Sequence, residues 1–276
     1  ISGVVTNEDG SALPDVLVEV GDITTRTSTK GDYVLEGVAP SDDLLVKFSS
    51  EGTTETYRQI DLHGWETATA NAVLMDVDHT QVISAVDGGT VTNGEVDIFF
   101  PERAFGEYEG EVTITFTYFD PYEDNLLATP GDLSGLALAD NNDAKSGTEP
   151  ASLVSYGMLN VQMSDQNGDD IQLVEGASAA VTMPITNGEL ADTYHLSDGS
   201  EAPTWHFDTQ RGTWVETGVG IVSEDEDGVL NFTFTADEFS WWNCDQGYVP
   251  SCAFGRITDI IKFPVRSAEV VCQGAQ

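Results

Sequence analysis

The chain has 276 residues, of which 40% are hydrophobic and 9% aromatic, enough apolar material for two or three ordinary domains with cores of their own. It carries 48 Asp and Glu residues against 10 Lys and Arg, a formal net charge of −38, which excludes nucleic acid and anionic membrane surfaces as partners. No run of about 18 apolar residues is present, so the sequence predicts no membrane span.

The carboxylate excess attracts cations, calcium among them, and suits a secreted protein or a saline habitat. The alternative is an acidic surface that only keeps the protein soluble and binds no particular ion. Ile1 opens directly on a strand-like pattern, so no signal peptide is visible; either it was removed or the chain was never exported. We expect a secreted or cell-surface protein.

Short alternating segments dominate the chain. Val16, Val18 and Val20 share one face of residues 16–20, and residues 112–118 and 230–235 alternate in the same way. Such runs of β-branched and aromatic residues are typical of half-buried strands. Asp-Gly and Asn-Gly pairs separate them, as expected for turns. The sequence therefore predicts an all-β fold of tandem β-sandwich domains.

Three regions follow from this pattern: a compact unit at 1–76, a larger β unit at 77–243, and a linker with two strands at 244–276. The third region repeats the first without gaps at an offset of 252, which places Val16 on Ala268 and Val18 on Val270. Two strands cannot bury a core alone. Either the protein continues beyond Gln276, or strands 253–276 pair with an open edge of another copy.

The first region carries a recognisable pattern of strand, Asp-Gly turn, proline, strand and Gly-Asp-Tyr turn. It consists of residues 3–10 (GVVTNEDG), 13–18 (LPDVLV) and 29–35 (TKGDYVL). This pattern resembles the carboxypeptidase regulatory-like domain, a small transthyretin-like β-sandwich. The resemblance implies a spacer-like domain without catalytic residues.

The second region resembles the β region that follows such a domain in cartilage intermediate layer protein and in bacterial surface proteins. The segments that carry this resemblance are residues 88–91 (GGTV), 101–105 (PERAF), 130–133 (PGDL), 156–159 (YGML), 205–208 (WHFD), 212–216 (GTWVE) and 239–243 (FSWWN). It implies an extracellular β architecture with no established chemistry.

The sequence offers no catalytic motif. Its histidines are His63, His79, His195 and His206, and none stands at a recognisable spacing from a Ser or Cys. The triplet from His206 to Asp208 resembles a self-cleaving His-Phe-Ser site of related β domains, but Asp208 has no hydroxyl to attack the backbone. We predict no catalytic residues and no enzyme.

Calcium is the expected ion, in a turn that offers carboxylate and amide oxygens at alternating positions around Gly168. The candidate ligands are Asp165, Asn167, Asp169 and Asp170, and the turn lacks the bidentate Glu of a full calcium loop because position 176 is Gly. A hairpin turn with solvated carboxylates is the alternative.

The cysteines and a tryptophan pair complete the candidate sites. If the two tail strands pair antiparallel, Cys252 and Cys272 come together in a disulfide; Cys244 with Cys252 is the alternative. Trp241 and Trp242 form either a sugar-stacking platform or an interdomain contact.

The sequence thus favours a non-catalytic structural or adhesive module of a surface protein. A filament subunit joined by donated β-strands, and a carbohydrate-binding module, are the alternatives.

Overall fold

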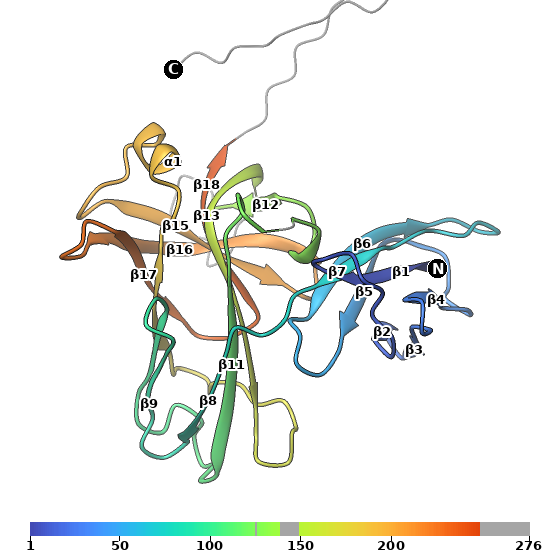
Figure 1. Cartoon of the computed structure of the whole chain (residues 1–276), viewed down its shortest axis with the longest axis horizontal. Helices are drawn as coiled ribbons and strands as arrows, with labels where there is room; N and C mark the ends of the chain where they lie inside the picture. Colours follow the sequence, from blue (N-terminus) through green and yellow to red (C-terminus); the bar gives the residue numbers. More distant parts are fainter. Residues whose placement is uncertain (125, 139–148, 249–276) are drawn as a thin grey trace, which may run out of the picture.

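A computed structural model describes residues 1–124, 126–138 and 149–248 (Figure 1). These residues form eighteen strands, one short helix and one 3-10 turn, so the predicted all-β, multi-domain sandwich fold is confirmed. No helix in these residues is long and apolar enough to cross a bilayer.

The N-terminal domain is a sandwich of two small sheets, ordered β4-β1-β7 and β3-β2-β5-β6. Its strands are β1 (Ser2–Asn7), β2 (Leu17–Val20), β3 (Ile23–Arg26), β4 (Asp32–Val34), β5 (Ser41–Ser49), β6 (Thr56–Leu62) and β7 (Ala72–Leu74). Val5, Val18, Phe48 and Leu74 are fully buried between the sheets. The alternation expected at residues 16–20 thus places apolar side chains inward, although Val20 is only partly buried.

The second domain is one 11-stranded sheet, ordered β8-β11-β13-β18-β15-β16-β17-β14-β10-β9, with β12 beside β13 and β16. Its elements are β8 (His79–Ser84), β9 (Gly89–Thr92), β10 (Asp97–Phe100), β11 (Glu111–Phe119), η1 (Leu126–Ala128), β12 (Ser134–Ala137), β13 (Glu149–Ser164), β14 (Ala179–Pro184), α1 (Gly188–Thr193), β15 (Glu201–Asp208), β16 (Thr213–Glu224), β17 (Leu230–Ala236) and β18 (Trp241–Tyr248).

The sheet folds over so that both of its halves contribute to one core. Ile114 and Phe116 of β11 meet Val181 of β14 and Phe232 of β17 there. Successive side chains of a strand point to opposite faces of the sheet, and in these strands the apolar ones all point into the core.

A third apolar cluster joins the two domains. Tyr57, Val73 and Met75 of the N-terminal domain pack with a set that includes Trp214 and Trp241 of the second domain. Figure 1 shows β6 and β7 on the side of the N-terminal domain that faces the second domain. Because this cluster is as buried as either core, the domains form one packed body.

Strand β18 extends past the expected end of the second domain. It pairs with β13 from Asn160↔Trp241 to Ser152↔Tyr248. Residues 244–248, assigned to the linker from sequence, therefore belong to this sheet, because each of them pairs with β13 and the first two, Cys244 and Asp245, are fully buried. Residues 249–276 lie outside the described residues, as does the loop at 139–148.

Candidate functional site

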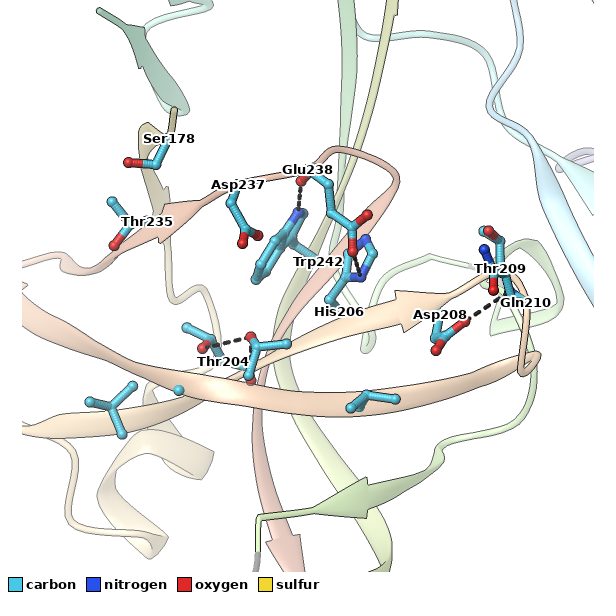
Figure 2. Close-up of a pocket in the computed structure, with 14 residues that line it drawn as sticks. Ser178, Thr204, His206, Asp208, Thr209, Gln210, Thr235, Asp237, Glu238 and Trp242 are labelled. Carbon is cyan, nitrogen blue, oxygen red and sulfur yellow. Dashed lines mark hydrogen bonds and ion pairs between the residues drawn. The ribbon is translucent and has the colours of Figure 1, made fainter. Parts of the chain in front are cut away.

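A cleft of about 690 Å³ opens in the second domain where β16 and β17 separate (Figure 2). We call it the β16–β17 cleft. Thr204, His206, Thr217, Val219, Asp237 and Trp242 are among its lining residues.

The cleft exists because β16 and β17 share only part of their lengths. Their ladder runs from Glu224↔Leu230 to Ile221↔Thr233 and stops there. Beyond that point β16 stays with β15, while β17 stays with β14 as far as Ala236. The register between β15 and β16 shifts at the same place: Thr204 pairs with Gly218 and Trp205 with Glu216, so that Thr217 is an extra residue on β16. Bulges of this kind bend a strand and redirect its side chains.

His206 is the central polar residue of the cleft wall. Its Nδ1 lies 3.2 Å from Oε1 of Glu238, and its Nε2 lies 2.8 Å from Oγ of Ser240. The ring packs against Trp242 with centroids 4.9 Å apart. Figure 2 shows His206 and Glu238 facing each other below the turn that follows β17.

Burial decides the charge of this group. Removal from water lowers the pKa of His206 to about 4, although Asp208 and Asp237 favour its charged form. Burial also raises the pKa of Glu238, and Asp237 and Asp208 raise it further. At neutral pH the imidazole is therefore uncharged, and we assign its single N–H to Nδ1, which faces the Glu238 carboxylate at 3.2 Å. Nε2 then accepts from the Ser240 hydroxyl.

Ser240, His206 and Glu238 have the order of groups found in a nucleophile, base and acid triad. No local motif signals this arrangement, because Ser240 lies 34 residues from His206 and they meet only through the pairing of β15 with β18. An imidazole whose pKa is about 4 is a weak base for a serine hydroxyl at neutral pH. The same hydroxyl also lies 3.3 Å from the Phe207 carbonyl. The group joins β15 to the turn before β18.

A second buried polar cluster lies on β18 and was not anticipated from sequence. Asp245 is fully buried, and burial raises the pKa of its carboxyl well above the usual value. Asn243 donates to its Oδ2 at 2.6 Å, and Ser155 donates to Oδ1 of Asn243 at 2.6 Å. Oδ1 of Asp245 has no hydrogen-bond partner among the described residues.

The candidate calcium turn follows β13. Oδ1 of Asp165 accepts the backbone N–H groups of Asn167 at 2.7 Å and Asp169 at 3.0 Å, and these bonds lower the pKa of its carboxyl. Within the described ranges no three His, Cys, Asp or Glu side chains gather as metal ligands. The calcium site, including Asp170, stays a prediction.

The cysteines and tryptophans lie in very different surroundings. Cys244 is a buried free thiol whose pKa is raised by burial, and Cys252 and Cys272 lie outside the described residues. Trp241 is fully buried between the domains, and Trp242 is 2% exposed. Neither indole offers an open face to a sugar ring.

Comparison with known families bears on the two domains separately. Residues 1–75 match the model of the carboxypeptidase regulatory-like domain. The N-terminal domain is a carboxypeptidase regulatory-like domain. Recognition of this domain from its sequence is therefore confirmed. Residues 132–245 match the model for the N-terminal part of FAM171A1/A2/B, a family that the sequence analysis did not name.

Two solved structures from Bacteroides resemble the whole chain weakly. A membrane-associated protein of unknown function from Bacteroides fragilis NCTC 9343 shares 10% identity at a TM-score of 0.23, over 90% of this chain and 97% of the other. A Bacteroides uniformis ATCC 8492 protein assigned provisionally to carbohydrate binding shares 11% identity at 0.19, over 86% and 97%. At these TM-scores neither likeness carries an argument about the carboxypeptidase regulatory-like domain or its neighbour.

Proposed function

We propose that the chain is a non-catalytic structural module of an extracellular surface protein, in which two β-domains act as one stiff unit. The observation that carries the proposal is the apolar cluster between the domains. A spacer must hold its domains in a fixed relation, and a buried apolar interface does this where a flexible linker would not.

Hydrogen bonds support the same interface. Nε1 of Trp241 donates to the Glu55 carbonyl at 2.8 Å, and the Gly131 N–H donates to the Tyr57 carbonyl at 3.1 Å. Nη1 of Arg58 donates to the Thr129 carbonyl at 2.7 Å, across 71 positions of sequence. Polar bonds that flank a dry cluster fix the orientation of the partners as well as their contact.

Neither domain matches a family of catalytic domains: one match is a regulatory-like domain and the other is the N-terminal part of FAM171A1/A2/B, which supports a structural role. The surface location rests on the chain's charge. A net charge of −38 keeps a protein dispersed in saline surroundings and keeps it away from nucleic acid.

Two experiments test the proposal. Differential scanning calorimetry of the full chain is expected to show one unfolding transition; two well-separated transitions would contradict a single stiff unit. Antibodies raised against the chain are expected to stain intact source cells. Staining only after permeabilisation would contradict the surface location.

A further inference from the structure

The β16–β17 ladder leaves a strand edge unpaired. Its pairing ends at Ile221, whereas β16 begins at Thr213, and β12 pairs with β16 only at Trp214 and Val215. Within the part of the chain that the structure describes, residues 216–220 therefore have no ladder partner on the β17 side, although Gly220 lies against Phe232 and the Thr233 carbonyl and the Glu216 side chain accepts the Leu138 N–H. An exposed edge of this kind is a template for pairing with another chain.

The cleft beside this edge has room for an added strand. Five residues of β16 extend over about 16 Å at the usual rise per residue, and the cleft volume is about 690 Å³. Val219 is 58% exposed and Ile221 is 46% exposed, both on the outer side of the edge. An incoming strand would make backbone hydrogen bonds to the edge and place alternate side chains against these two residues.

The negative charge of the cleft limits which segments could pair with this edge. Asp237 and Glu238 line it, and its Asp208 already forms an ion pair with Arg211 at 3.4 Å. A chain of net charge −38 offers few segments that an acidic cleft would accept. Residues 256–263 (RITDIIKF) are one, since they contain two basic residues, one acidic residue, three isoleucines and a phenylalanine.

Chain length leaves the same molecule little slack with which to fill its own cleft. Trp242 lines the cleft, and β18 runs away from it to Tyr248, about 20 Å along the strand. The seven residues at 249–255 span at most about 25 Å fully extended, only slightly more than the roughly 20 Å that they would have to run back, and a reversal of direction uses part of that reach. We propose that residues 256–263 of a second copy add a strand to the 216–220 edge in the β16–β17 cleft.

The test uses the full chain and two variants, one altered at the strand edge in the cleft and the other in the donated segment. Val219→Glu adds a charge at the edge, and the double variant Ile260→Asp, Ile261→Asp damages the donated segment. Val34→Glu is the matched control, because Val34 is 60% exposed on the N-terminal domain. Sedimentation velocity at about 5 to 500 µM in 0.15 M salt covers the affinities typical of transient pairing.

The wild-type chain and Val34→Glu are expected to form oligomers that grow with concentration. Each cleft or segment variant alone should self-associate at least about tenfold more weakly. An equimolar mixture of the two variants should give dimers and nothing larger, because only one cleft and one segment remain intact in each pair.

A wild-type chain that stays monomeric throughout, or oligomers unchanged by Val219→Glu, would overturn the proposal. Circular dichroism checks that Val219→Glu is folded, and Thr235→Glu, on the opposite wall of the cleft, replaces it if it is not. Neither result bears on the stiffness of the two-domain unit, which the calorimetry tests separately.

Discussion

The indole nitrogen of Trp241 donates a hydrogen bond of 2.8 Å to the carbonyl of Glu55, across 186 positions of sequence. Trp241 is fully buried, and its ring belongs to the cluster between the domains. This contact places a residue of the last described strand against the N-terminal domain.

Trp241→Ala is expected to cost about 3–5 kcal/mol, as for a large buried aromatic side chain. Calorimetry should then show two transitions, because the domains lose much of their shared core. Trp241→Phe keeps most of the packing and should cost less than Trp241→Ala. Trp65→Ala, at a fully exposed tryptophan, is the control and should change nothing. An unchanged single transition in Trp241→Ala would contradict the role given to this ring.

His206 makes stability depend on pH below neutrality. Its folded pKa of about 4 lies below the unfolded value of about 6.5, so protonation favours unfolding. Its contribution is complete above pH 6.5 and declines by up to about 3 kcal/mol as the pH falls toward 4. Urea titrations at pH 7 and 4.5 should show a smaller pH effect for His206→Gln. Equal pH effects in the two proteins would contradict a buried neutral imidazole.

Asp245 gives stability a pH dependence of the opposite sign to that of His206. Burial raises the pKa of its carboxyl above the unfolded value, so its contribution is complete below the unfolded pKa and declines as the pH rises toward the folded one. Asp245→Asn keeps the shape without the charge. It should be about 1–3 kcal/mol more stable than wild type at pH 8 and show no such gain at pH 3. If Asp245→Asn is less stable than wild type at both pH values, the folded state instead depends on an ionised carboxylate at this position.

Two matched turns separate a calcium site from a simple hairpin. Asp165 and Asp225 each accept two backbone N–H bonds of their own turns, so alanine at either position should lower stability by a small and similar amount. If Asp165 also binds calcium, EGTA should lower the melting temperature of the wild type and of Asp225→Ala, but not that of Asp165→Ala. If EGTA leaves the melting temperature of all three proteins unchanged, Asp165 binds no calcium.

The Ser240–His206–Glu238 group should not act as a nucleophilic site. A fluorophosphonate probe labels activated serines, and we expect no mass increase after hours at pH 7.5, because the imidazole is a weak base. Ser240→Ala is the control. A stoichiometric adduct on the wild type that is lost in Ser240→Ala would contradict the non-catalytic function.

Local alternation was sufficient to predict much of the fold. Val112, Ile114 and Phe116 point inward because β11 has one apolar face, and that face is visible in the sequence. The carboxypeptidase regulatory-like domain was recognisable because its turns recur at fixed spacings along one short segment.

The site could not be predicted in the same way. The cleft depends on where the β16–β17 ladder stops, and Ser240 meets His206 only after β15 pairs with β18. The Trp241–Glu55 contact depends on how two domains dock. None of these contacts leaves a periodic signal in sequence, since each joins residues that are distant along the chain.

Residual dipolar couplings measured on the full chain in a weakly aligning medium test the central claim most directly. If the two domains form one stiff unit, couplings from β1–β7 and from β8–β18 fit a single alignment tensor. Separate tensors of clearly different magnitude or orientation would show that the domains move independently and would contradict the account.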